Sequence, residues 1–362
     1  MDPELKLFLD TTRQLLAEPG VDVRRLHASG DVLDRTWWKR AAEVGWTALA
    51  APEAFGGGSI TGNAVLDLAA LADELGRHAA PGPLFPVATV LTGLAEFDEY
   101  SAVAESIVAG ETVAAWAFSG DGYPLQRDPT VTATPAGSGY VLNGVVERVE
   151  AAPQADVFLV PAKSADGGII QVVVERAAAG LSVRPARSID LTRHYGTVVF
   201  GEVAVAHIGE SAVAAMERQL QIAVLLRCAE TVGVITKAFE MTRQWAFDRY
   251  SFGRPLASYQ VLKHRYANMF MWLQACEATT AAAALAVQNR DPDADRLLSV
   301  AKTYTGEKSV QILQDCIQLH GGIGVTWEHD LHLYLRRAAL DANTFGTPDD
   351  HCRWLAEGLE AP

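Results

Sequence analysis

Two short segments in the C-terminal half of the chain combine residue types that suit a ligand carrying both a phosphate and a ring. The first, Arg249 to Pro255, reads RYSFGRP, and the second, Gln318 to Thr326, reads QLHGGIGVT. The guanidinium of Arg249 presents planar donors to a phosphate, and Phe252 presents an aromatic face to a ring. Adjacent glycines let backbone N–H groups approach an anion closely. These residue types therefore favour an anionic ligand with an aromatic part.

Each segment also has a plain structural interpretation. Basic residues followed by Gly and Pro are typical of an ordinary helix end, and for Arg249 to Pro255 the two interpretations are equally weighted. A third segment, Ser258 to His264, is better explained as a helix start capped by Ser258 than as part of a ligand site. The glycines after Gln318 read more simply as a helix terminator. A helix is expected before them, whereas a nicotinamide-dinucleotide fingerprint needs a strand.

The elements that must position these segments follow from the hydrophobic periodicity. Residues 1–110 show helical spacing, with Gly76 as the expected C-cap of a helix over Ala64 to Leu75. Residues 111–208 form short Val- and Ile-rich runs separated by turns, which predicts a small antiparallel β-barrel or sandwich. Residues 209–362 return to the helical period. The sequence thus predicts an α+β chain: an N-terminal helical domain, a middle antiparallel β-barrel domain and a C-terminal four-helix bundle. The expected bundle helices are Val213 to Asp248, His264 to Gln288, Asp293 to His320 and Trp327 to Ala342.

Composition narrows the class of protein. The chain has 362 residues with a formal net charge of −14, which argues against nucleic acid or an anionic membrane as the main partner. Its four cysteines form no CxxC pair, so we expect free thiols in a reducing, cytoplasmic compartment. No stretch approaches the ~18 uninterrupted apolar residues of a membrane-spanning helix. His329 and His332, with the acidic residues beside them, are not expected to bind a metal.

Taken together, the order and spacing of these segments resemble the acyl-CoA dehydrogenase family. The resemblance also includes Glu43 to Trp46, Asp73 to Gly76, Pro81 to Leu84 and Leu142 to Gly144. It implies FAD held between subunits, an acyl-CoA substrate and an electron-transfer flavoprotein as acceptor. It further implies an oligomer, homomeric or heteromeric, with a tetramer expected. By resemblance, the cofactor-binding residues are Arg249, Phe252, Gln260, Gln318, Gly321 and Gly322.

The family's reaction needs a carboxylate that removes the α-proton of the thioester. Most members carry it as a Glu after the fourth C-terminal helix, but the matching stretch, Ala342 to Pro348, contains none. A second family position, on the first bundle helix, falls near Ala223. Glu230 lies seven residues further, on about the same helix face and among apolar residues, so it is the candidate base. The alternative is that Glu230 pairs with Arg227 on a solvated or interface face.

Other departures from the family leave a second interpretation open. The segments Ala117 to Gly122 and Arg148 to Glu150 replace the family's usual flavin contacts in the strand domain. Asp190 to Arg193 and Phe345-Gly346 look like an actinobacterial branch that handles CoA thioesters of steroid side chains, often as two different subunits. The chain is therefore expected to dehydrogenate an acyl-CoA with Glu230 as base. Alternatively, it is a flavin-sharing partner subunit without a complete site, or a relative that oxidises a non-CoA substrate.

Overall fold

A computed structural model describes residues 2–18, 23–29, 32–119, 128–206 and 212–358. The segment Ala117 to Gly122 differs from the family pattern, and its residues 120–122 lie outside the described ranges. The chain divides into two compact units. Unit 1 comprises residues 1–68 and 81–223, and unit 2 comprises residues 69–80 and 224–362. The predicted domain boundaries at residues 110 and 208 remain predictions.

The N-terminal region is helical, as predicted from its apolar spacing. Asp2 and Asp34 each accept backbone N–H bonds at a helix start, which fixes where α1 and α3 begin. Every residue of α5 except Thr92 is buried, which accounts for its continuous apolar run. The α-helices are α1 (Pro3–Leu16), α2 (Val23–Ser29), α3 (Arg35–Val44), α4 (Ala64–Arg77), α5 (Leu84–Leu94) and α6 (Ser101–Val108). Short 3₁₀ turns lie at Ala48–Ala50, Glu53–Phe55 and Asp98–Tyr100.

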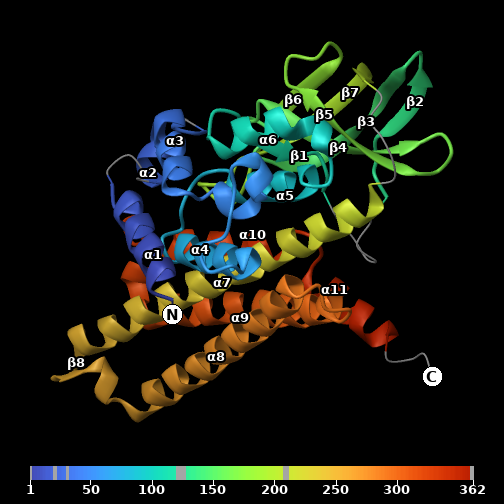
Figure 1. Cartoon of the computed structure of the whole chain (residues 1–362). Helices are drawn as coiled ribbons and strands as arrows, with labels where there is room; N and C mark the ends of the chain where they lie inside the picture. Colours follow the sequence, from blue (N-terminus) through green and yellow to red (C-terminus); the bar gives the residue numbers. More distant parts are fainter. Residues whose placement is uncertain (1, 19–22, 30–31, 120–127, 207–211, 359–362) are drawn as a thin grey trace. The chain divides into compact units, whose positions relative to one another are not determined.

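The strand region forms one curled, mixed sheet rather than the predicted antiparallel barrel (Figure 1). Among the described residues the strand order is β1-β4-β2-β3-β7-β6, with β5 paired to β4. The prediction was wrong for β1 and β2, which both run parallel to β4. Turn signals between neighbouring strands reveal antiparallel hairpins, but nothing local specifies pairing with a distant strand. The strands are β1 (Ala114–Trp116), β2 (Thr132–Ala136), β3 (Gly139–Glu150), β4 (Val157–Ser164), β5 (Ile169–Glu175), β6 (Leu181–Ala186) and β7 (Tyr195–Ala206).

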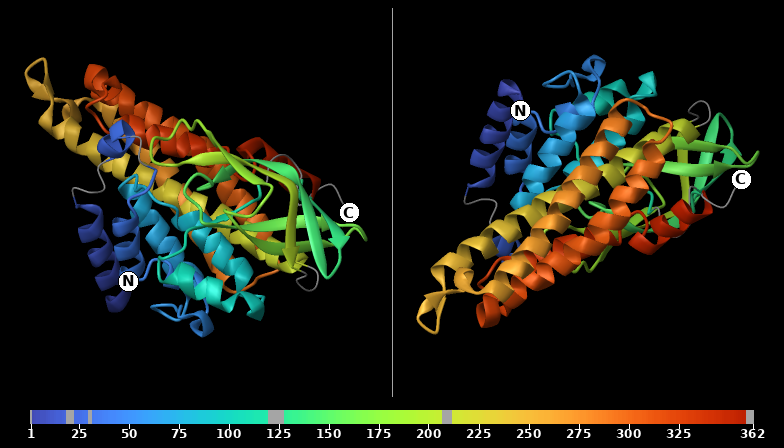
Figure 2. Two further views of the ribbon diagram at one scale, coloured as in Figure 1. Left: turned by 90° about the horizontal axis from the view of Figure 1, so that it is seen from above. Right: turned by 90° about the horizontal axis from the view of Figure 1, so that it is seen from below.

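The C-terminal region consists of long helices lying alongside one another (Figure 2), so its predicted helical character is confirmed. The predicted number of four was wrong, because a fifth helix forms at Pro348–Glu357. The helices are α7 (Val213–Asp248), α8 (Gln260–Gln288), α9 (Ala294–His320), α10 (Leu331–Ala342) and α11 (Pro348–Glu357). A hairpin of β8 (Tyr250–Ser251) and β9 (Arg254–Pro255) joins α7 to α8, and the 3₁₀ turns η5 (Leu256–Ser258) and η6 (Gly321–Val325) follow β9 and α9.

The predicted cap at Ser258 was wrong. Its hydroxyl donates to the carbonyl of Pro255 at 2.7 Å, inside the 3₁₀ turn. Helix α8 begins two residues later, at Gln260, without a side-chain cap.

Two glycines allow α4 and α7 to touch through their backbones within unit 2. A Cβ on Gly76 would collide with the backbone carbonyl of Glu230, and one on Gly233 would collide with that of Asp73. Gly76 therefore does not serve as the predicted C-cap, since α4 continues through Arg77. Its absent side chain instead lets the end of α4 lie directly against the turn of α7 that carries Glu230.

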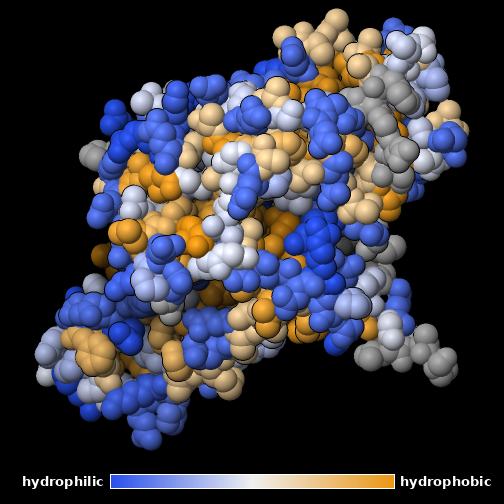
Figure 3. Space-filling view, viewed as in Figure 1, coloured by the Kyte–Doolittle hydropathy of each residue, from blue (hydrophilic) through white to orange (hydrophobic). Residues whose placement is uncertain are grey.

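Apolar side chains interrupt the hydrophilic surface near the β8–β9 hairpin on the face drawn in Figure 3. Phe252 in this hairpin is 97% exposed, and Tyr250 is also exposed. Among the described helices, α8 is long and apolar enough to pass a length-and-composition test for crossing a membrane. Core helices pass the same test, so that result is weak evidence.

Candidate functional site

Glu230 lies in the interior of unit 2 with no exposed side-chain surface. Its carboxylate forms an ion pair with Arg337 of α10, and Arg227 Nη1 lies 3.6 Å from its second oxygen. Both arginines are as buried as the glutamate. Two guanidinium groups therefore surround the carboxylate and stabilise its charge.

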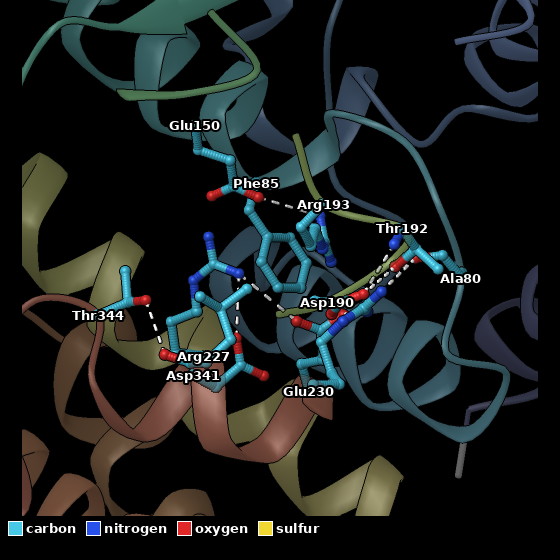
Figure 4. Close-up of polar contacts among 12 residues, drawn as sticks. Ala80, Phe85, Glu150, Asp190, Thr192, Arg193, Arg227, Glu230, Asp341 and Thr344 are labelled. Carbon is cyan, nitrogen blue, oxygen red and sulfur yellow. Dashed lines mark hydrogen bonds and ion pairs between the residues drawn. The ribbon is translucent and has the colours of Figure 1, made fainter. Parts of the chain in front are cut away.

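The pair belongs to a larger buried network, part of which is drawn in Figure 4. Arg227 Nη1 lies 3.1 Å from Asp341 Oδ1, and Lys302 donates to the backbone carbonyl of Asp341. Arg337 also donates to the carbonyls of Ala79 and Ala80, at 3.4 and 3.1 Å. The network joins α7, α9, α10 and the residues after α4. Burial lowers the pKa of Lys302 to about 8.

This geometry confirms one expectation for Glu230 and corrects two others. The predicted burial is confirmed, since Glu230 is fully enclosed. The predicted apolar surroundings were wrong, because Arg337, 107 residues away, supplies a charge that local sequence does not reveal. The alternative pairing with Arg227 occurs, but in the interior rather than on a solvated face. A carboxylate held in this way is suited to joining helices.

Residues 342–348, at the end of α10, are the stretch in which the resemblance led us to look for a Glu. Two polar side chains of this stretch form hydrogen bonds with the backbone of α10. Asn343 Nδ2 donates to the carbonyl of Ala339 at 2.8 Å, and Thr344 Oγ1 donates to that of Leu340 at 2.9 Å. His351 of α11 contacts the carbonyl of Phe345 at 2.9 Å. Residues 342–348 contain no acidic side chain that could act as a base.

Arg249 and Phe252 lie where α7 ends and the hairpin begins. The backbone N–H of Arg249 donates to the carbonyl of Trp245 at 2.9 Å, and its guanidinium lies 6.0 Å from the centre of the Trp245 ring. Phe252 has a left-handed φ of 49° and a side chain 97% exposed. Gly253 also has a left-handed φ, 78°, so these two residues form the two-residue hairpin loop in which both positions need a positive φ.

The glycine turn after α9 offers open space next to its backbone. A Cβ on Gly321 or Gly322 would meet no atom within 4 Å, so a ligand can approach these backbones closely. Gly321 has a φ of 67° and a ψ of −142°, a conformation essentially restricted to glycine. Gln318 and Gln260 are both exposed, in the last turn of α9 and at the first residue of α8. The turn, the glutamines and Arg249 therefore fit the phosphate-bearing half of a dinucleotide.

Glu230 lies far from Arg249, which directly follows the end of α7. Arg249 lies 19 residues after Glu230, which corresponds to about 28 Å along the helix axis at the α-helical rise. Trp245 connects Arg249 with the end of α9, because its ring lies 6.0 Å from the Arg249 guanidinium and 5.3 Å from the ring of His320. Glu230 lies 15 residues before Trp245 on α7.

Unit 1 contains the segments of the strand region that depart from the family pattern. Buried Arg193 donates to the carbonyl of Gly82 at 2.9 Å and lies 3.3 Å from Glu150 Oε1, with its guanidinium 4.6 Å from the centre of the Phe85 ring (Figure 4). Nearby, Asp190 accepts from the backbone and hydroxyl of Thr192, both at 2.8 Å.

The backbone near Glu150 is strained. Arg148 and Ala151 have left-handed φ values of 55° and 61°, next to a register shift between β3 and β7. Irregularities of this kind often occur at functional sites.

Sequence reasoning missed two features of unit 2. Asp73 on α4 lies near Glu74, Glu240 and Glu277, and burial together with these charges raises its pKa to about 7. A Trp-His-His ring stack next to the glycine turn was also missed, although His320 directly precedes the glycines. Glu240 and Glu277 in the first case, and Trp245 in the second, lie far away in the sequence, so no local spacing signals these contacts.

His329 and His332, which were not expected to bind a metal, both make ring contacts. His329 lies edge-on to His320 with ring centroids 4.6 Å apart, and His332 stacks on Trp327 at 4.9 Å. Within the described ranges, no three His, Cys, Asp or Glu side chains come together as a possible metal site.

Comparison with known proteins assigns both ends of the chain to one family. Residues 2–116 match the N-terminal domain model of acyl-CoA dehydrogenases, and residues 213–360 match the C-terminal domain model. A Mycobacterium tuberculosis relative named acyl-CoA dehydrogenase IpdE2 is 29% identical, covering 99% of this chain and 98% of its own.

Two solved structures are also similar. The Tcur3481-Tcur3483 steroid acyl-CoA dehydrogenase variant is 28% identical with a TM-score of 0.87, covering 99% of both chains. The ChsE4-ChsE5 complex of M. tuberculosis is 25% identical with the same TM-score, covering 100% of this chain and 99% of the other.

Proposed function

Because the chain belongs to the acyl-CoA dehydrogenase family of flavin-dependent oxidoreductases, we propose that it is the flavin-sharing subunit of a two-component acyl-CoA dehydrogenase. In this proposal the assembled enzyme introduces an α,β double bond into an acyl-CoA thioester. This chain supplies cofactor contacts, and a different subunit supplies the carboxylate that removes the α-proton. Two of the similar structures, Tcur3481-Tcur3483 and ChsE4-ChsE5, are each named for a pair of proteins, which supports a heteromeric assembly.

The arrangement of Glu230 is the observation that carries this proposal. A general base must reach the substrate and exchange a proton with it. Glu230 is instead enclosed, with Arg337 paired to one carboxylate oxygen and Arg227 3.6 Å from the other. Releasing it would leave two buried guanidinium groups without this counter-charge, which costs several kcal/mol (about 3–5). The other family position for a base, within residues 342–348, contains no carboxylate.

The residues that would hold FAD are those that the resemblance indicated. Arg249 would pair with the pyrophosphate, and the open backbone of Gly321 and Gly322 would receive the adenosine-diphosphate half, with Gln318 and Gln260 at its sides. Phe252, whose side chain is 97% exposed, would contact the flavin shared with a neighbouring chain. Bound FAD supplies the hydride acceptor of the reaction.

The substrate and the electron acceptor are extensions of the same proposal. The similar Tcur3481-Tcur3483 protein is a steroid acyl-CoA dehydrogenase, which supports a bulky, steroid-derived acyl group as substrate. We further propose an electron-transfer flavoprotein as acceptor, a tetrameric assembly and a cytoplasmic location. The net charge of −14 makes an anionic membrane surface an unfavourable partner.

A second candidate function keeps the base on this chain. Its support is the complete burial of Glu230, because a desolvated carboxylate is a stronger base than an exposed one. In this version Arg337 releases Glu230 when substrate binds, and the chain is active as a homo-oligomer.

Expression with and without a second subunit separates the two candidates. The chain is purified alone and then with a co-expressed catalytic subunit of the same family. The flavin absorbance per chain and the turnover with a steroid-derived acyl-CoA are then measured. The proposal predicts a colourless, inactive chain that gains flavin and activity only in the complex. A yellow, active homo-oligomer would support Glu230 as the base instead.

A further inference from the structure

A stack of three rings lies beside the glycine turn of unit 2. His320, the last residue of α9, packs against Trp245 of α7 with ring centroids 5.3 Å apart and planes 17° from parallel. The ring of His329 also contacts His320 edge-on, with ring centroids 4.6 Å apart. His320 is 6% exposed, so its ring is held between helices rather than in solvent.

The ring of His320 is fixed by a hydrogen bond as well as by stacking. Its Nδ1 lies 2.9 Å from the carbonyl of Cys316, one turn earlier in α9, which assigns the proton to Nδ1. Burial lowers the pKa of His320, so the neutral ring is favoured. The orientation of the imidazole at the end of α9 is therefore determined by both α7 and α9.

The glycine turn folds back onto this same residue. A Cβ on Gly324 would lie 2.9 Å from the Cβ of His320 and 2.7 Å from the carbonyl of Ile317. Gly324 thus packs directly on His320, whereas Gly321 and Gly322 face open space. The position of His320 consequently sets where the open backbone of Gly321 and Gly322 lies.

The stack also reaches Arg249. The carbonyl of Trp245 accepts the backbone N–H of Arg249 at 2.9 Å, and the Arg249 guanidinium lies 6.0 Å from the centre of the Trp245 ring. Trp245 is thus shared by the segment that holds Arg249 and the helix end that holds His320. The two segments with phosphate-binding character are connected through one pair of stacked rings.

We infer that His320 is a positioning residue, which, with Trp245, holds the Arg249 segment and the Gly321-Gly322 turn in the spacing that binds the adenosine-diphosphate half of FAD. This inference rests on the proposed function, since it assigns the residue that organises that cofactor site. His320 itself is enclosed and acts through the two segments it holds. Its removal lowers affinity for the diphosphate-bearing half of the cofactor and spares the rest of the fold.

The test measures affinity rather than activity. The complex of this chain with the co-expressed catalytic subunit is used, after its flavin has been removed. Dissociation constants for ADP and for FAD are measured by titration calorimetry for wild type, His320→Ala and His320→Phe. Val325→Ala is the matched control, because Val325 is 74% exposed in the same turn and takes no part in the stack.

We expect His320→Ala to weaken binding of ADP and FAD at least tenfold, and Val325→Ala to change it less than twofold. His320→Phe keeps a ring against Trp245 and should recover binding to within about threefold of wild type. Recovery by a ring that cannot hydrogen-bond shows that stacking positions the two segments. Chemical unfolding of each variant, measured in parallel, shows whether a loss of affinity merely follows a loss of stability. If His320→Ala does not fold, Trp245→Leu removes the same contact from α7 and is expected to weaken ADP binding to the same degree.

Two contrary results have different meanings. Wild-type affinity for ADP in both His320→Ala and Trp245→Leu overturns this inference and leaves the proposed function standing. A wild-type complex that binds neither ADP nor FAD overturns the proposed cofactor site, and this inference with it.

Discussion

Replacing Arg337 with methionine tests how strongly the buried charge network holds unit 2 together. The substitution keeps a long, unbranched side chain. It removes one of the two guanidinium groups beside Glu230, together with the hydrogen bonds from Nη2 to the carbonyls of Ala79 and Ala80. Breaking a buried pair by removing one partner typically costs about 3–5 kcal/mol, because the other charge stays buried. We expect Arg337→Met to lower the free energy of unfolding by that amount.

The assay is urea unfolding followed by far-ultraviolet circular dichroism. Arg336→Met is the matched control, since Arg336 is only partly buried on the same helix, and it should cost less than about 1 kcal/mol. The double variant Glu230→Leu with Arg337→Met removes both charges and should recover at least half of the loss. If Arg337→Met unfolds within about 1 kcal/mol of wild type, the network is not what holds these helices together.

Three further predictions concern buried groups of unit 2. Lys302 has a pKa lowered to about 8 in the folded protein against 10.5 ordinarily, so stability should rise between pH 8 and 10.5 by up to about 3 kcal/mol, and Lys302→Met should flatten that rise in unfolding curves. Asp73 has a pKa raised from 3.8 to about 7, so the free energy of unfolding should fall as the pH rises from 3.8 to about 7. Asp73→Asn should therefore be more stable than wild type at pH 8, by up to about 4 kcal/mol, and not at pH 4. Gly233→Ala forces a methyl group against the α4 backbone and should cost about 1–3 kcal/mol in the same assay, whereas Gly358→Ala, with no atom within 3.5 Å of the new Cβ, should cost little.

Much of the fold could be predicted because it depends on local periodicity. The helix over Val213–Asp248 has the predicted bounds, and α8, α9 and α10 end at the predicted residues, whereas α11 was not predicted. The parallel pairing of β1 and β2 with β4 could not be predicted, since no turn signal joins strands that lie far apart in the sequence.

The candidate site was predictable in its residues but not in its contacts. Residue types and resemblance were enough to select Arg249, Gly321 and Gly322, because their chemistry depends on their own side chain or backbone. The environment of Glu230 was not predictable, because Arg337 approaches it from a helix 107 residues later. Gly76 was likewise wrongly predicted to be a helix cap. Nothing in the local sequence shows that the Glu230 carbonyl of α7 lies where a side chain at position 76 would be.

The most direct test of the central claim is the turnover of the Glu230→Gln variant per bound flavin in the assembled enzyme, at a temperature where the variant is folded. The amide retains the size of the carboxylate but cannot remove a proton from the thioester. A structural Glu230 predicts turnover within about threefold of wild type, together with a lower free energy of unfolding. Loss of turnover by a thousandfold or more, with flavin still bound, would contradict this account and identify Glu230 as the base.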